Sequence, residues 1–278
     1  DSLIEQESLR KGEKFSEHII PDVGLQHRYM TLPGWIVGKL ETIPGVLMVM
    51  PDPGTPEPIA LEEPGDFSVV SGELHGATDS WDLNISGNGI KVAVADSGLD
   101  EDHGDFGTRV VGNYDVIGDG STADKHSGHG THVACTVLGD GSKGGYAGVA
   151  PDAELYFQAM EIVINFNFVS PSLNYLLNTA YNAGARIHTN SWGSSATSTQ
   201  GEYTSEAEAV DDRSFNYDKV SNGQEGLTIL FAAGNDGPNP GTVGSPSTAK
   251  NVVTVGNHQA RYSGAPDNLM SGSSRGPT

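Results

Sequence analysis

Five short apolar runs, each ending in polar or small residues, constrain the fold of this chain more than any other feature. Segments of helical length separate most of the runs, which lie at residues 89–98, 153–160, 185–193, 227–235 and 251–257. Strands that are apolar on both faces are typical of a parallel sheet covered by helices. We therefore predict an α/β fold with three layers, in which a mostly parallel sheet has helices on both faces.

Residues 170–185 predict one of the covering helices. Ser170 is the expected N-cap, Pro171 suits the first turn, and Gly184 suits the end of the helix. Sites in open parallel sheets lie at the carboxyl ends of the strands. The polar residues that end three of the runs are Asp96, Asn190 and Asn235.

The segment 51–66 marks the expected domain boundary. It contains five prolines and five acidic residues in PDPGTPEPIALEEPGD, a composition that predicts an extended and solvated connector. We expect a small N-terminal α+β domain with its connector over residues 1–65 and a larger domain over residues 66–278.

Charge and cysteine content narrow the function classes. The formal net charge is −21, which argues against nucleic acid and anionic membrane surfaces as partners. No apolar run reaches the roughly 18 residues that span a bilayer. The only cysteine is Cys135, so the chain has no internal disulfide. We expect a buried, inert thiol, and the alternative is a redox-sensitive thiol.

The stretch HSGHGTHVACTVLGDG, residues 126–141, allows two chemistries. His129 and His132 lie three apart and would share a helix face, but zinc sites of this kind usually carry a glutamate that is missing here. The alternative is acid–base work by His129, at the start of a helix where two glycines permit close backbone approach. We favour the second interpretation and expect His126 at the surface and His132 in a packed structural position.

A general base needs a carboxylate partner, and Asp96 provides one from another strand end. A buried aspartate fixes the tautomer of an imidazole and stabilises the imidazolium. Asn235 follows a strand in FAAGNDGPN, where its amide suits a developing oxyanion, although an Asn-Asp-Gly turn explains the same letters. Gly193, in TNSWGS, suits pairing with an extended peptide by strand addition.

Several of these segments together resemble the subtilisin-like serine proteases, the subtilase family. The resemblance covers about residues 67–278 and is carried by VAVADSGLD, HSGHGTHVACTVLGDG, GVAPDAEL, TNSWGSS, LFAAGNDGPN and SSRGPT. It implies the subtilisin-like three-layer fold, incomplete at the C-terminus, and an acyl-enzyme mechanism acting on peptide or protein substrates. In the family order of Asp, then His, then Ser, Asp96 would orient the base and His129 would be that base.

The resemblance also assigns the surrounding residues. Asn235 would donate to the oxyanion. Ser191, Trp192 and Gly193 would form one wall of the substrate cleft, and the floor or far wall of the specificity pocket would be Ala232, Ala233 and Gly234.

The nucleophile motif of the family, a turn of the Gly-Thr-Ser-Met-Ala type, does not occur in residues 1–278. This chain alone is therefore expected to be inactive. Three alternatives stay open. The chain is the front fragment of a protease whose remainder, a separate chain, carries the serine, or the sequence ends at an artificial boundary. The third alternative is a catalytically inactive pseudoprotease that binds peptides or regulates a partner.

The remaining expectations come from the family. The segment HRYMTLPGWIVGKLETIPGVLMVMPD, residues 27–52, is similar to the end of a subtilase propeptide. This similarity implies that residues 1–65 form an inhibitory and folding-assisting domain in a zymogen-like state, and the alternative is a plain N-terminal extension packed on the catalytic domain. The family also implies secretion. Structural calcium is common in the family, and the Asp- and Gly-rich turns 118–125 and 138–145 offer oxygens, although loop chemistry explains both equally well. No catalytic cofactor is expected, and no metal ligands are assigned.

Overall fold

The computed structural model describes residues 16–19, 28–31, 56–58, 75–125, 128–143, 145–162, 167–194, 196–214, 226–258 and 268–278. The chain forms two compact units, residues 1–52 and 53–278. The predicted boundary at residue 65 lies outside the described residues. In the first unit, β1 (Ser16–Ile19) and β2 (Arg28–Thr31) form an antiparallel pair.

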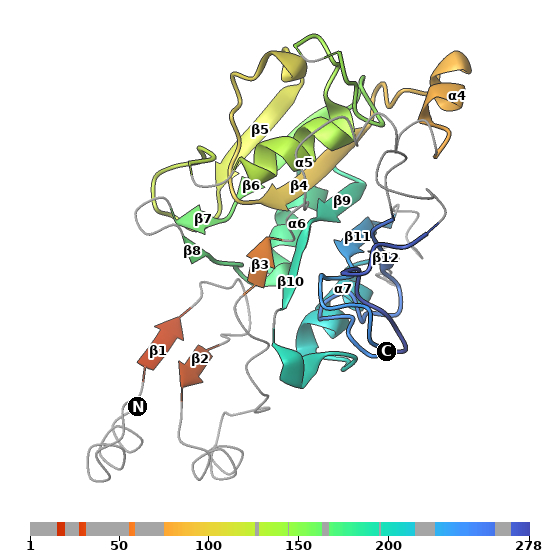
Figure 1. Ribbon diagram of the computed structural model, residues 1–278. Helices are drawn as coiled ribbons and strands as arrows, with labels where there is room; N and C mark the ends of the chain where they lie inside the picture. Colours follow the sequence, from red (N-terminus) through yellow and green to blue (C-terminus); the bar gives the residue numbers. More distant parts are fainter. Residues whose placement is uncertain are drawn as a thin grey trace, which may run out of the picture. The chain divides into compact units, whose positions relative to one another are not determined.

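The second unit contains a six-stranded parallel sheet (Figure 1). Its order is β12-β11-β9-β4-β6-β5, and every ladder within it is parallel. The strands are β4 (Lys91–Asp96), β5 (Val110–Asp115), β6 (Glu154–Ala159), β9 (Ile187–Asn190), β11 (Thr228–Ala232) and β12 (Val253–Val255). The mostly parallel sheet expected from the apolar runs is therefore confirmed.

Shorter elements and helices complete this unit. The helices are α4 (Ala77–Asp82), α5 (His129–Leu138), α6 (Leu173–Asn182) and α7 (Ser205–Ser214), with 3-10 turns η1 (Gly104–Phe106) and η2 (Thr197–Thr199). The short strands are β3 (Pro56–Pro58), β7 (Glu161–Ile162), β8 (Asn167–Phe168) and β10 (Trp192–Ser194). β7 pairs with β8, and β10 pairs with β3, both antiparallel.

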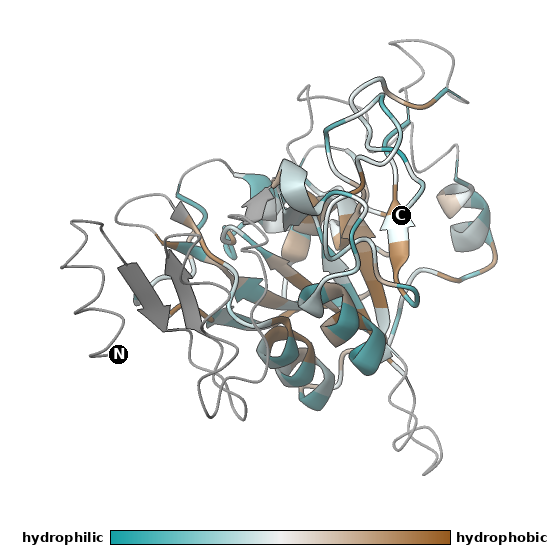
Figure 2. Ribbon diagram, turned by 90° about the horizontal axis from the view of Figure 1, so that it is seen from below, coloured by the Kyte–Doolittle hydropathy of each residue, from teal (hydrophilic) through white to brown (hydrophobic). Residues whose placement is uncertain are grey.

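Alternation along β4 explains the three layers. Val92 and Val94 pack in one core with Ala134 and Leu138 of α5. Ala93 and Ala95 face the opposite side, where Ala95 joins a second core that includes residues of α6 and α7, and Ala93 packs with Ala180 of α6. Successive side chains of a strand point to opposite faces, so a fully apolar strand needs a helix layer on each side. Figure 2 shows the apolar strands lying between helices that carry hydrophilic outer sides.

The predicted helix 170–185 is present as α6, but its start differs from the prediction. Ser172, not Ser170, is the N-cap, and its hydroxyl accepts a hydrogen bond from the Tyr175 N–H at 3.2 Å. Pro171 consequently precedes the helix. The end was predicted correctly, since Gly184 follows the C-cap with φ 94°, a conformation that glycine adopts without strain.

Candidate active site

The start of α5 is built around close backbone contacts. His129 is the first helical residue, after Gly128 with φ 69°. A Cβ on Gly130 would collide with the carbonyl oxygen of Gly98 just beyond β4, and a Cβ on Gly98 would lie 2.6 Å from Ala123. Only glycine allows the helix to approach the end of β4 this closely.

This approach brings Asp96 and His129 into contact. The Asp96 carboxylate Oδ1 lies 2.6 Å from His129 Nδ1, and both side chains are buried, with exposed fractions of 0% and 8%. Oδ1 also accepts the Ser97 N–H at 2.7 Å, whereas Oδ2 is buried with no hydrogen-bond partner among the described residues. The contact selects the tautomer in which Nδ1 carries the proton, so Nε2 is the ring nitrogen able to accept one.

Two residues that the sequence reasoning missed hold the start of α5 in place. The Ser97 hydroxyl accepts the Gly130 N–H at 3.0 Å and donates to Asp124 Oδ1 at 3.1 Å. Asp124 further accepts the N–H groups of Gly128 and Thr131, at 3.1 and 2.9 Å, and the Thr131 hydroxyl at 2.8 Å. The carboxylate therefore satisfies helix N-terminal donors that the N-cap glycine cannot. Asp124 lies within the Asp- and Gly-rich turn 118–125, whose composition suits calcium binding and loop formation equally well.

His132, predicted to be packed, is exposed instead. It lies two positions before the buried Ala134, and two helical steps of 100° place it on the opposite side of α5. Partial desolvation, followed by the charge of His129, lowers its pKa. His126 lies outside the described residues.

The three residues predicted to form one wall of a substrate cleft lie in or directly before β10. Trp192 is buried in the core: its indole N–H donates to the Ala95 carbonyl at 2.9 Å, and its ring meets Phe231 edge-on with centroids 5.0 Å apart. Along β10, Trp192 lies opposite Pro58 and Gly193 lies opposite Glu57 of β3. Ser191 directly precedes this strand.

The segment after β11 carries the other predicted residues. Ala232 accepts the Ser247 hydroxyl at 2.6 Å, Ala233 donates to the Val255 carbonyl at 2.8 Å, and Gly234 accepts the Ser274 N–H at 2.9 Å. Gly234 has φ 110°, and a Cβ there would lie 2.7 Å from the Ser274 hydroxyl. Asn235 is exposed, three residues beyond β11. Since β9 alone separates β4 from β11, two strand spacings of about 4.8 Å separate the end of β4, which carries Asp96, from the end of β11.

The two loops with calcium-like composition fold their carboxylates back onto the chain. Asp115, Asp119 and Asp140 accept nearby backbone N–H groups at 2.6–3.0 Å. In such turns, backbone N–H groups occupy the acceptor sites of the carboxylates without a cation. Calcium binding here stays a prediction.

Comparison with known proteins identifies the family. A model of the subtilase family matches residues 87–278, which is most of the chain and includes both members of the buried pair. The chain belongs to the subtilase family.

Individual relatives show what share of a full-length protein this chain covers. It is 32% identical over 200 residues to the minor extracellular protease Vpr of Bacillus subtilis, covering 65% of this chain and 22% of Vpr. It is 42% identical over 83 residues to the major intracellular serine protease of the same species, covering 28% of this chain and 26% of that protein. The chain thus spans about a quarter of the length of these two subtilases.

A solved protease structure supports the fold. The S41 psychrophilic protease aligns with a TM-score of 0.54 and 28% identity, over 69% of this chain and 61% of that one. The predicted subtilisin-like α/β fold is therefore confirmed. Among the described residues, no helix is long and apolar enough to cross a membrane.

Proposed function

We propose that the protein containing this subtilase chain is a serine endopeptidase that cleaves peptide bonds through an acyl-enzyme. The buried contact of 2.6 Å between Asp96 and His129 carries the proposal. His129 Nε2 would take the proton of the nucleophilic serine and return it to the leaving amine. Asp96 would hold the tautomer and stabilise the imidazolium, and Asn235 would donate to the oxyanion.

The serine itself would come from a segment outside residues 1–278, either a continuation of the polypeptide or a separate chain. The test is labelling with a fluorophosphonate probe, which reacts with an activated serine. The natural-length protein should be labelled, and His129→Ala should abolish labelling while leaving the fold intact by circular dichroism. A folded protein that resists the probe counts against the proposal.

That negative outcome would favour the second candidate, a catalytically inactive module that binds peptides or regulates a partner. The pairing of β10 with the extended β3 supports this candidate, because it places a strand along β10 without any chemistry. Peptide binding that persists in a protein unreactive toward the probe would identify the module.

We also propose that residues 1–65 act as a propeptide that occupies the substrate position along β10. The support is the antiparallel register of β3 and β10, with Glu57 opposite Gly193. Pro56 and Pro58 lack an N–H, so Glu57 is the only residue of β3 able to donate a backbone hydrogen bond.

The matched variants are Glu57→Pro and Glu57→Ala. Both remove the carboxylate, but only the proline removes the N–H. Inhibition should weaken in Glu57→Pro and persist in Glu57→Ala, measured as hydrolysis of a chromogenic peptide. Equal activity of the two variants would contradict the proposed role of β3.

Secretion and structural calcium complete the proposal. One relative is named an extracellular protease and another an intracellular one, so the location must be measured. We expect the protein in the culture medium rather than in cells, and a lower thermal midpoint after calcium chelation. An unchanged midpoint would argue against structural calcium.

A further inference from the structure

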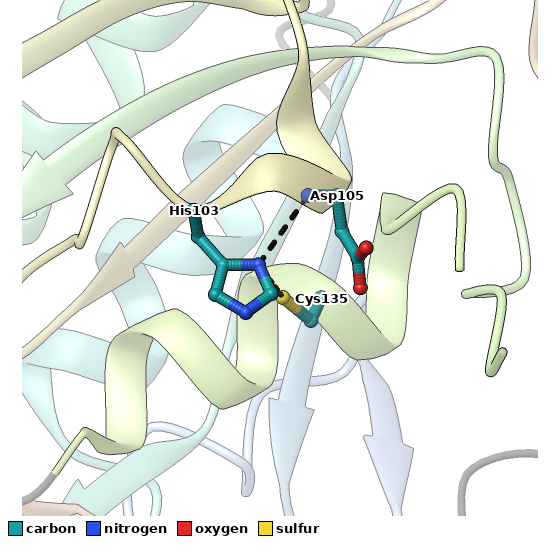
Figure 3. Close-up of side chains that lie close together, drawn as sticks. All are labelled: His103, Asp105 and Cys135. Atoms are coloured by element: carbon teal, nitrogen blue, oxygen red, sulfur yellow. Dashed lines mark hydrogen bonds between the residues drawn. The ribbon is translucent and has the colours of Figure 1, made fainter. Parts of the chain in front are cut away.

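Cys135 has no role in the proposed catalysis. It lies beside two other side chains of types that can bind a metal ion. It projects from α5 toward His103 and Asp105, which come from the η1 segment (Figure 3). One ligand atom from each of the three residues lies within 4.8 Å of the others. His103 Nδ1 and Cys135 Sγ are 3.8 Å apart. The described residues contain no other group of three such side chains.

The hydrogen bonds at this cluster leave lone pairs that could bind a cation. Asp105 is buried, and its Oδ1 accepts the Lys143 N–H at 2.6 Å and the Ser142 hydroxyl at 3.2 Å, so Oδ2 retains its lone pairs. His103 Nδ1 accepts only a long hydrogen bond, 3.4 Å from the Asp105 N–H, besides its contact with the thiol. Second-sphere bonds to Oδ1 hold the carboxylate in orientation, as they do in metal sites.

We propose that His103, Asp105 and Cys135 form a binding site for one divalent transition-metal ion of the zinc class. Ligands of a tetrahedral ion at about 2.0–2.3 Å from the metal lie about 3.3–3.8 Å apart, close to the separation of Nδ1 and Sγ. Thiolate and imidazole favour zinc or cadmium over calcium, which prefers oxygen ligands. A water molecule would take the fourth position.

The charges around the thiol favour a cation. Burial, followed by the negative charge of Asp105, raises the pKa of Cys135 to about 12, with Asp100 and Asp140 adding to the effect and Arg109 opposing it. The thiol is therefore protonated in the metal-free protein. On binding, the sulfur–metal bond replaces the S–H bond and the proton passes to solvent, with no redox change.

The site would fasten η1 to α5, the helix whose first residue is His129. Because α5 already contacts η1 through these side chains, a metal would restrict the movement of the helix without touching the Asp96–His129 pair. Its role would be structural, and its loss should be seen as lower thermal stability.

The test uses Cd²⁺ alone as the probe with the natural-length protein. Thiolate binding to Cd²⁺ gives an ultraviolet charge-transfer band, so one equivalent should saturate this band in the unmodified protein. Cys135→Ser should abolish the band. His103→Ala should weaken Cd²⁺ binding by at least about 10-fold, the loss typical even of outer-sphere changes. Zn²⁺ should raise the thermal midpoint of the unmodified protein but not of His103→Ala.

His132→Ala is the matched control, because it removes an exposed histidine one turn before Cys135 on the same helix. This variant should bind Cd²⁺ like the unmodified protein. A band that forms with undiminished affinity in His103→Ala would show a lone thiol binding the ion and would overturn the proposal. Absence of any saturable band in the unmodified, folded protein would overturn it as well.

Discussion

At the scale of single residues, the contact between Asp96 and His129 carries the proposed chemistry. The carboxylate accepts from Nδ1 in a buried position, so the imidazole is held in one tautomer. Its neighbours Gly98 and Gly130 also matter, since a methyl group on Gly130 would collide with the Gly98 carbonyl beyond β4 and one on Gly98 would collide with Ala123. The geometry thus depends on two residues with no side chain at all.

Asp96→Asn tests the tautomer argument. An amide at this position can donate to Nδ1, which would move the ring proton to Nε2 and leave no base. We expect kcat/KM for peptide hydrolysis to fall by about 10⁴-fold with little loss of stability. Asp102→Asn, an exposed carboxylate nearby, is the control and should change neither quantity. A near-normal rate in Asp96→Asn would contradict the assignment.

At the scale of elements, α5 depends on a carboxylate from outside the helix. Asp124 accepts two backbone N–H groups near its first turn and the hydroxyls of Ser97 and Thr131. Negative charge at a helix N-terminus is also favoured by the helix dipole. The helix that carries His129 is therefore fixed by a loop that precedes it.

Asp124→Ala should lower the free energy of unfolding by about 1–3 kcal/mol, because several partly buried donors lose their acceptor. Urea denaturation measures the change. Asp124→Asn keeps an acceptor oxygen and should lose less. If the alanine variant is as stable as the parent, the hydrogen bonds around Asp124 contribute no net stability.

β9 carries a second polar network, centred on the fully buried His188. Its Nε2 lies 2.9 Å from Gln158 Oε1 and its Nδ1 lies 3.1 Å from Asn190 Nδ2. Nδ1 accepts from the amide and Nε2–H donates to Gln158, so only the neutral ring fits. Burial lowers the pKa of His188 to about 3.

The depressed pKa predicts acid sensitivity. Because the folded pKa lies below the unfolded value near 6.5, the stabilisation is complete above pH 6.5 and declines by up to about 1.4 kcal/mol per unit as pH falls toward 3. NMR titration should show His188 unchanged down to about pH 5, well above its pKa, while the exposed His132 is followed as a comparison. Protonation of His188 above that pH would contradict the neutral-ring network.

At the scale of the whole molecule, charge opposes the compact state. With a net charge of −21, the negative side chains repel one another at low ionic strength. Salt screens this repulsion, because it shortens the Debye length from about 30 Å at 0.01 M to about 3 Å at 1 M. We therefore expect the thermal midpoint to rise between these concentrations of NaCl. An increase with sulfate but none with chloride would indicate general salting-out instead of screening.

The sequence by itself determined the features that depend on neighbouring residues. Apolar runs indicated β4, β6, β9, β11 and β12. In β4 and β6 the run corresponds to a strand buried on both faces, whereas β12 at the sheet edge is exposed. Gly128 and Gly130 indicated the start of α5, since a left-handed turn and a close approach both require glycine. β5 was missed: its half-exposed residues lack that pattern, and Gly112 interrupts it.

Only the tertiary structure decided which distant side chains meet. Ser97 reaches Gly130 at the start of α5 across 33 residues, and His103 reaches Cys135 across 32 residues. No local pattern records such contacts, because each residue alone also suits a turn or a solvated surface. Their convergence follows from parallel strands that end at one edge of the sheet and a helix packed closely against it.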